Sequence, residues 1–363
     1  MESKNGFLLF TDFHANIWQE FSKPCYDKYL VNTRFSEQIR VLKEIFERAY
    51  KDNLIVVFGG DLFDSRIKLD SRVFYSVFRV INSYRTVPVY LLRGNHDSVD
   101  NTMESPNSLD PFNYPKINHY VVDTPAQFTE YIGNSPANKV NLSFMPYGEN
   151  VKEMKDTMKN FADHLDPKAY NIFVGHFGVD GATQGKHSHR LAGAFSVDDL
   201  YPDKYDLVYL GHYHKRQNLG GYNHVLYGGS TMPINFNDEG EQKGYDIVTI
   251  KDGKLDREFV PVKAKPFVTL TSWTDKDKKI AENAYVRLQL PEKDIKGVSI
   301  PESDKSFVRV EPVREYKIES RLDISQEDED NPVKITDKYL SKYYPDIDLI
   351  KEAQEVLTEV DKA

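Results

Sequence analysis

Several aspartate, asparagine and histidine residues of this 363-residue chain directly follow short apolar runs. The candidate metal-ligating groups among them are Asp12, His14, Asp61, Asn95, His176, His212 and His214. Carboxylate oxygen and imidazole nitrogen suit Mn, Fe or Zn, and the lack of cysteine ligands argues against a closed structural zinc site. Seven groups are too many for one ion. With one bridging carboxylate they predict two ions, which in such sites lie about 3.5 to 4 Å apart.

Two pairs among these residues have a spacing that suits a shared ion. Asp12 and His14 are two positions apart, as are His212 and His214. Alternate side chains of extended backbone point to the same side, so each pair could reach one centre. The alternative is that these are hydrogen-bonded core or loop residues, as a single buried histidine usually is. Five independent repeats of the arrangement favour a site.

The apolar runs themselves predict the strands that position these groups. They occupy residues 7–10, 54–58, 87–92, 172–174 and 207–210. Helical periodicity predicts one helix over residues 36–49, with Ser36 available as N-cap, and another over residues 70–85. These two helices separate the first three strands. This β-α-β-α-β series predicts parallel strands with right-handed crossovers. Because ligands bind at the carboxyl ends of such strands, we expect the five ends to face one crevice.

The chain divides into four predicted parts. They are residues 1–262, 266–322, 323–332 and 333–363. The first carries every candidate ligand and ends in alternating, antiparallel-like segments over residues 225–260. The second suits a small α/β module, and the third is an acidic linker. The fourth is predicted to be helical in two pieces broken at Pro345. It could dock on a partner or fold back on its own chain, and the pattern alone does not choose.

The composition restricts the class of protein. The single cysteine, Cys25, cannot form an internal disulfide, and no apolar stretch is long enough for a membrane span, so we expect a soluble cytoplasmic protein. The formal charge of −9 is unusual for a protein that holds DNA by its own phosphate contacts. Either nucleic acid is not the substrate, or a partner supplies most of the grip and the metal ions neutralise the site locally.

The ordered motifs resemble those of the calcineurin-like metallophosphoesterase superfamily. They are Asp12-x-His14, Gly60-Asp61-x-x-Asp64, Gly94-Asn95-His96-Asp97, Gly175-His176 and Gly211-His212-x-His214. The match extends over about residues 6–249. Within the superfamily the chain is most similar to SbcD-type recombination nucleases, especially those of large tailed phages, on softer features such as residues 186–189 and 227–230. The resemblance implies an α/β fold: a β-sandwich flanked by helices, a small α/β capping domain and C-terminal helices.

The resemblance also implies roles for the site residues. One ion, with Mn expected, would be held by Asp12, His14, Asp61 and His214. The other would be held by Asp61, Asn95, His176 and His212, so that Asp61 bridges. The ions would activate a water for attack on phosphorus, and His96 would protonate the departing 3′ oxygen. Asp64 is the candidate for orienting His96; some nucleases of the family carry histidine there, which leaves open how phosphodiester geometry is enforced.

The resemblance implies partners as well. The chain would act on DNA as an exonuclease and endonuclease in recombination and double-strand-break processing, with an SbcC-like SMC-type ATPase, as a homodimer within a heterotetramer and without a membrane. Residues 266–322 would cap the DNA and residues 333–363 would dock the ATPase. A phage-encoded member would work in the host cytoplasm. Candidate contacts to DNA phosphate are Arg66, Arg93, His187 and His189, although each could equally be an ordinary surface or supporting residue.

Two other functions are compatible with the sequence. One is a stand-alone metallophosphatase or nucleotide phosphodiesterase on the same fold, because a fold does not fix its substrate. It would leave the 102 residues after Pro261 unexplained. The other is a non-catalytic scaffold subunit, which predicts the loss of at least one catalytic group, and none is missing.

Overall fold

The computed structural model describes residues 3–25, 30–133, 135, 137–183, 195–301, 305, 307–313, 332–344 and 347–360. Contacts divide the chain into two units, Met1–Pro312 and Val313–Ala363. None of the described helices combines the length and the apolar character needed to cross a membrane.

The first six-stranded sheet holds three of the five predicted ligand-bearing strands. Its order is β12-β11-β1-β2-β3-β4. The strands are β1 (Gly6–Phe10), β2 (Leu54–Phe58), β3 (Val89–Leu92), β4 (His119–Val122), β11 (Gly244–Lys251) and β12 (Lys254–Pro261). The four strands from β1 to β4 are parallel neighbours, while β11 runs antiparallel to both β1 and β12. The parallel β-α-β-α-β series is therefore present.

The second six-stranded sheet holds the other two ligand-bearing strands. Its order is β5-β6-β7-β8-β10-β9. The strands are β5 (Ala126–Tyr131), β6 (Lys139–Met145), β7 (Tyr170–His176), β8 (Leu207–Gly211), β9 (Gln217–Asn218) and β10 (Val225–Tyr227). The structure corrects one expectation, because β10 lies in this second sheet, parallel to β8 and antiparallel to β9, and does not join the antiparallel pair of β11 and β12. All three residues of β10 are buried, as is typical of a parallel strand covered on both faces.

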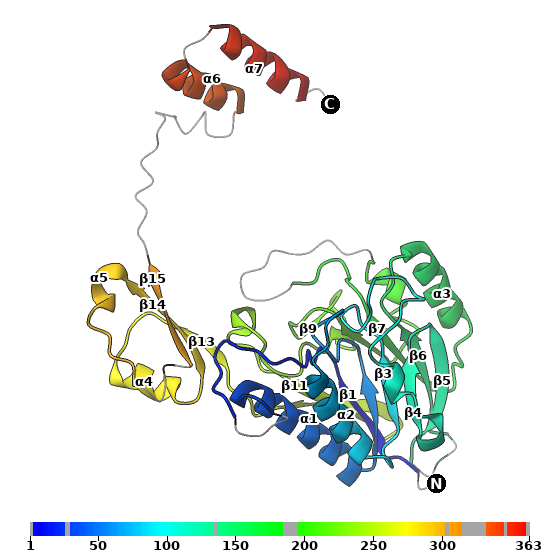
Figure 1. Cartoon of the computed structure of the whole chain (residues 1–363). Helices are drawn as coiled ribbons and strands as arrows, with labels where there is room; N and C mark the ends of the chain where they lie inside the picture. The colour runs from blue at the N-terminus through cyan, green and yellow to red at the C-terminus, as the bar shows by residue number, and fades with distance from the viewer. Residues whose placement is uncertain are drawn as a thin grey trace. The chain divides into compact units, whose positions relative to one another are not determined.

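Helices cover the outer faces of the two sheets (Figure 1). On the first sheet these are α1 (Thr33–Lys51) and α2 (Ser71–Ser83), and on the second α3 (Val151–Asp163). A separate apolar core fills the space between the sheets, where Leu9 and Val57 of the first pack with Phe144 and Val174 of the second. The predicted β-sandwich flanked by helices is confirmed. Single-turn 3-10 helices interrupt the loops at η1 (Asp110–Phe112), η2 (Pro115–Ile117), η3 (Asp198–Leu200) and η4 (Phe236–Asp238).

Helix α1 begins earlier than its apolar periodicity indicates. The predicted N-cap, Ser36, lies inside the first turns, and the cap is Asn32, whose side chain accepts a hydrogen bond from the Phe35 amide at 2.9 Å. Asparagine caps as well as serine does. The apolar stripe hides this start because the first turn contains Arg34, a polar residue that is nevertheless buried.

A three-stranded sheet follows in the same unit. It consists of β13 (Phe267–Leu270), β14 (Tyr285–Pro291) and β15 (Val308–Val313), with α4 (Asp275–Ala281) and α5 (Glu292–Ile295). Phe267 and Tyr285 pack with Phe21 of the larger part in one buried cluster. Arg34 lies over Phe267 and Tyr285 and donates to the Ile234 carbonyl. The predicted boundary at residues 262–266 stays a prediction.

The described residues of the unit Val313–Ala363 form the helices α6 (Pro332–Tyr343) and α7 (Ile347–Val360). They pack on each other, and Gln354 donates to Asp337 at 2.7 Å. Tyr339, Leu349 and Val356 are exposed. The acidic segment at residues 327–330 lies outside the described residues.

Candidate metal centre

Backbone hydrogen bonds tie together the loops that follow β1, β2 and β8. The amide of Asp12 donates to the Gly60 carbonyl at 2.9 Å, and that of His14 donates to the Asp61 carbonyl at 3.0 Å. The amide of His212 donates to the Asp12 carboxylate at 3.0 Å. Segments 200 residues apart in sequence are thus fixed to one another at the carboxyl ends of their strands.

Four of the predicted ligands have a left-handed backbone. Their φ angles are 51° for Asp12, 47° for His14, 62° for Asp61 and 97° for His212. Such angles cost free energy for residues other than glycine, and they persist only where the surroundings impose them. These strained turns direct the four side chains inward from the ends of the strands.

One group of ligand atoms gathers around His14. Its Nε2 atom lies 3.0 Å from His214 Nε2, 3.6 Å from Asp61 Oδ2 and 3.9 Å from Asp12 Oδ1. The three residues Asp12, His14 and His214 offer ligand atoms that all lie within 4.8 Å of one another. Two imidazole nitrogens and two carboxylates therefore converge on one small volume.

A second group gathers around Asn95. Its Oδ1 atom lies 3.1 Å from His176 Nε2 and 3.0 Å from His212 Nδ1. His176 Nε2 also lies 3.2 Å from Asp61 Oδ2. The same carboxylate oxygen of Asp61 thus faces both groups, and the structure brings all seven predicted ligands together.

The hydrogen bonds around His176 suit a metal ligand. Its Nδ1–H donates to the carbonyl oxygen of Gly59 at 2.8 Å, which fixes the ring with Nε2 facing Asp61 and Asn95. Ligating histidines commonly make this second hydrogen bond. The donor set and its orientation therefore fit a dimetal centre.

Charge inside the centre shifts the pKa values of its groups. Burial opposes a charged imidazole at His14, but the carboxylates of Asp12 and Asp64 raise its pKa to about 10. At His176 burial is likewise outweighed, and the charge of Asp61 raises the pKa to about 9. Burial alone would raise the pKa of Asp61, but the neighbouring histidines lower it well below its usual range. The centre thus holds ionised carboxylates that attract cations.

The other two histidines shift in the opposite direction. Burial and the charge of His176 lower the pKa of His212 to about 4. Burial and the charge of His14 lower the pKa of His214. Both imidazoles are therefore neutral at ordinary pH, which is the form that binds a metal.

Asp97 supports the bridging residue, a role that the motif did not reveal. Its buried carboxylate accepts hydrogen bonds from the amides of Asp61 at 2.9 Å, Leu62 at 2.9 Å and Gly94 at 3.0 Å. Gly94 must be glycine, because a Cβ atom there would lie 2.1 Å from Asp61 Oδ1. The two residues together hold the Asp61 turn in place.

Lys243 supports His214, and sequence reasoning missed it. Its buried ammonium donates to the His214 carbonyl at 2.6 Å and to the carboxylates of Asp238 and Glu241, each at 2.7 Å. All three donors of the lysine are therefore used. No sequence signal could have found this residue, because it lies 29 positions after His214 and outside every motif.

His96 is held differently from what the sequence predicted. Its Nδ1 atom lies 2.6 Å from the backbone carbonyl oxygen of Asp64, not from the carboxylate. The Asp64 carboxylate instead accepts from Asn16 at 2.8 Å and lies 3.4 Å from His14 Nδ1, without hydrogen-bond geometry to that atom. Asp64 therefore orients His96 through its main chain, because its side chain is directed toward Asn16 and His14.

Arg93 is not placed to contact DNA. Its side chain is 1% exposed, and it donates to the carbonyl groups of Thr102, Met103 and Tyr147 at 2.7 to 3.1 Å. A buried guanidinium with these partners braces the loop after β3. The candidate contact between Arg93 and phosphate is thus corrected to an internal structural role.

The remaining candidate contacts with DNA divide in two. Arg66 is half-buried and donates to Asn101 at 2.8 Å. His187 and His189 lie outside the described residues.

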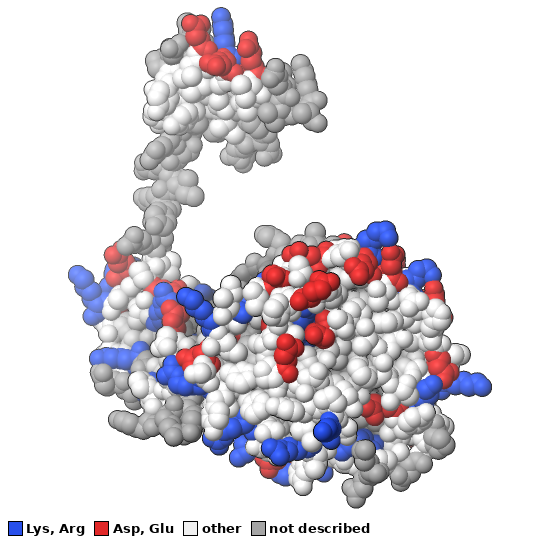
Figure 2. Space-filling model, turned by 45° about the vertical axis from the view of Figure 1, so that its right-hand side comes forward, with Lys and Arg blue, Asp and Glu red and all other residues white. Residues whose placement is uncertain are grey.

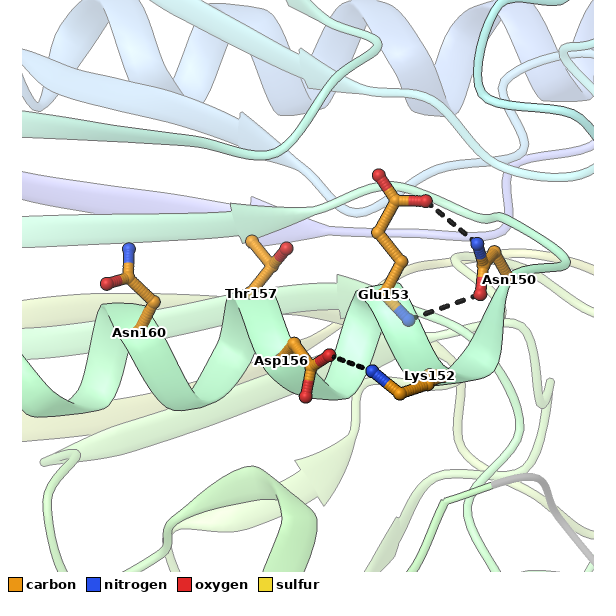
Figure 3. A pocket seen from close by; sticks show the side chains of 6 residues that line it. All are labelled: Asn150, Lys152, Glu153, Asp156, Thr157 and Asn160. Atoms are coloured by element: carbon orange, nitrogen blue, oxygen red, sulfur yellow. Dashed lines mark hydrogen bonds and ion pairs between the residues drawn. The ribbon is translucent and has the colours of Figure 1, made fainter.

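Another polar hollow lies on α3, away from the ligands (Figure 3). Its lining residues come from the helix and its N-cap, and they pair with each other: Asn150 with Glu153, and Lys152 with Asp156. These polar groups satisfy one another, so the hollow offers no second site.

Comparison with known proteins agrees with this geometry. Residues 6–216 match the family model for calcineurin-like phosphoesterases, so the chain belongs to that family. Members of the family bind a dimetal centre, which the seven groups here fit.

A curated relative and a solved structure add detail. The SbcD component of the nuclease SbcCD from Staphylococcus saprophyticus subsp. saprophyticus is 26% identical over 231 residues, which cover 58% of this chain and 58% of that protein. The match thus spans less than two thirds of that relative. The predicted similarity to SbcD-type metallophosphoesterases is confirmed. A conserved Streptococcus pneumoniae TIGR4 protein, a predicted phosphoesterase, is 11% identical over 72% of this chain and 91% of its own, with a TM-score of 0.28, too low to bear on the fold.

Proposed function

We propose that this phosphoesterase is a Mn-dependent DNA nuclease that hydrolyses phosphodiester bonds as an exonuclease and an endonuclease. The observation that carries the proposal is the position of Asp61 Oδ2, which lies 3.6 Å from His14 Nε2 and 3.2 Å from His176 Nε2. A carboxylate between two histidine groups suits a bridge between two ions, and two-metal sites are typical of phosphodiester cleavage.

The proposed ligands fall into two sets that share Asp61. Asp12, His14 and His214 complete the first set, and Asn95, His176 and His212 complete the second. When bound, the ions would supply an activated water and neutralise the charge that develops on the phosphate. The protein holds the ligand atoms in position. The Asp97 carboxylate accepts a hydrogen bond from the Asp61 amide, and the Lys243 ammonium donates to the His214 carbonyl.

His96 is the proposed general acid. Its ring lies beside that of His14, with the centroids 4.8 Å apart, and it is only half-buried. The carbonyl of Asp64 accepts a hydrogen bond from Nδ1–H, which fixes the orientation of the ring and leaves Nε2 to face substrate. In the proposed step a proton passes from Nε2 to the departing 3′ oxygen.

The proposed partners rest on the similarity to an SbcD component of the nuclease SbcCD. Helices α6 and α7 carry exposed Tyr339, Leu349 and Val356, and such a face suits docking on an SbcC-like SMC-type ATPase. The small sheet from β13 to β15 would cap bound DNA. The complex would be a heterotetramer built on a homodimer of this chain, working in recombination and double-strand-break processing.

One assay tests the proposed activity. The purified chain with Mn is offered linear duplex DNA, single-stranded DNA and a phosphate monoester, and an Asp61→Asn variant serves as the control for the centre. We expect cleavage of DNA that requires both Mn and Asp61. Turnover of the monoester while both DNA substrates stay intact would refute the nuclease.

A further inference from the structure

A groove of about 1140 Å³ crosses the amino ends of the parallel strands of the first sheet. Residues that come just before β1, β2, β3 and β4 line it: Lys4, Asn53, Pro88 and Asn118. The metal ligands follow the carboxyl ends of these strands. Since the strands are parallel, the groove and the metal centre lie at opposite edges of the sheet.

Positive charge is concentrated in this groove. Lys4, Lys51, Arg85 and Lys116 line it, and among its described lining residues Glu130 is the one carboxylate. A neighbouring hollow shares Arg85 and Lys116, and no acidic residue is among those described as lining it. Figure 2 shows lysine and arginine side chains gathered along the lower edge of the larger unit. The whole chain has a net charge of −9, so the excess of positive charge in the groove does not reflect the average composition of the chain.

Exposed tyrosines accompany these cations. Tyr50 is 58% exposed and Tyr131 is 54% exposed, and both line the groove. Tyr114, in the neighbouring hollow, is 43% exposed. Exposed aromatic rings beside basic side chains are the combination that binds single-stranded nucleic acid, because bases stack on the rings while the cations contact the backbone.

Contacts within the protein account for only some of the lysine and arginine side chains in the groove. Lys51 pairs with Glu47 in the last turn of α1, and Lys4 donates to Asn53. Arg85 makes one long hydrogen bond, 3.3 Å, to Asn82. Among the residues that the structure describes, neither Arg85 nor Lys116 forms an ion pair with a carboxylate. Their charges are therefore available to an external anion.

We propose that this groove binds single-stranded DNA. Arg85 and Lys116 contact backbone phosphates, while Tyr50 and Tyr131 stack on bases that are unpaired. A duplex offers no such bases, because its own base pairs are already stacked, so the tyrosines distinguish the two forms. The site is separate from the metal centre and needs no metal ion, so it goes beyond the proposed nuclease activity and would bind a strand that is not being cut.

Fluorescence anisotropy of the full chain in EDTA tests this proposal, because without metal ions no cleavage occurs. The probe is a labelled thymidine oligonucleotide of about 16 nucleotides, a length in the range of known single-strand sites. The double variant Arg85→Glu/Lys116→Glu should lower its affinity at least about tenfold and reduce the salt slope by about 1.4, the value expected when two phosphate contacts are lost.

A second variant separates stacking from charge. Tyr50→Ala/Tyr131→Ala should lower the affinity about 30-fold or more, because two stacking contacts are lost, and leave the salt slope unchanged. The matched control is Lys152→Glu/Lys159→Glu on α3, which reverses two exposed charges elsewhere and should change nothing. Thermal unfolding of each variant checks that it is folded.

Three results would overturn the assignment. They are unchanged oligonucleotide binding by Arg85→Glu/Lys116→Glu, equal affinity for a duplex of the same length, and failure to bind the oligonucleotide while a peptide of residues 325–332 binds the groove. The last would make the surface a docking site for an acidic segment. None of these results depends on whether the chain cleaves DNA, so this proposal and the proposed function can fail separately.

Discussion

His96 is not one of the proposed ligands: its ring lies beside that of His14, and the residue is only half-buried. His96→Ala should leave metal binding as it is and lower kcat about 100- to 10,000-fold, the usual contribution of a general acid. The measurement is Mn binding together with the rate of DNA cleavage. His164→Ala, an exposed histidine at the end of α3, is the control. Full activity of the His96→Ala variant would show that His96 is not the general acid.

Protons and metal ions should compete at His14 and His176. Their pKa values, about 10 and about 9, mean that both imidazoles are protonated at pH 7 when no metal is bound. A metal needs the neutral form, so its binding must release these protons, and the apparent affinity for Mn should rise with pH up to about those values. Titration calorimetry in buffers of different ionisation enthalpy counts the protons released. An Mn affinity that is constant from pH 6 to pH 9 would contradict the assignment.

The sequence predicts the residues that would bind the metal ions better than it predicts the residues that hold those ligands in position. Motif spacing after apolar runs singled out all seven groups that the structure brings together. Lys243 contacts the main-chain carbonyl of His214. Every residue type has such a carbonyl, so this contact leaves no motif in the sequence. The same reason explains Asp64, whose carbonyl rather than its carboxylate meets His96.

The start of α1 offers a test at the scale of one element. Asn32→Ala removes the cap of the Phe35 amide and a hydrogen bond to the Trp18 carbonyl at 2.9 Å. It should lower the free energy of unfolding by about 1 to 2 kcal/mol. Ser36→Ala, at the position predicted as cap, should change it by less than about 0.5 kcal/mol. Urea unfolding in EDTA measures both. Equal losses would show that Asn32 is not the cap.

Element types followed from periodicity, whereas their pairing did not in every case. Residues 54–58 and 172–174 are apolar throughout, which is typical of buried parallel strands, and both form them. The short run at β10 has too few residues to show alternation, so the direction of its pairing with β8 could not be predicted.

The helices α6 and α7 allow a test at the scale of the whole molecule. Deleting residues 333–363 should abolish binding of an SbcC-like ATPase and spare basal nuclease activity, because every proposed metal ligand lies in the unit Met1–Pro312. Co-purification and a DNA cleavage assay on the same preparation measure the two properties. Unchanged ATPase binding would place the docking surface elsewhere.

How the parts join was the least predictable feature. Nothing in the periodicity shows that Arg34 of α1 would lie against Phe267 and Tyr285, more than 200 positions away, and so seat the small sheet on the larger part. Such contacts depend on tertiary packing rather than on local pattern. The carboxyl ends of parallel strands, by contrast, were expected to meet because parallel topology requires it.

The most direct test of the central claim is anomalous diffraction at the Mn edge from crystals of the chain grown with Mn. We expect two peaks about 3.5 to 4 Å apart, both within bonding distance of the Asp61 carboxylate, one also beside His14 and His214 and the other beside Asn95 and His176. A single peak, or two peaks that do not share Asp61, would contradict the dimetal centre.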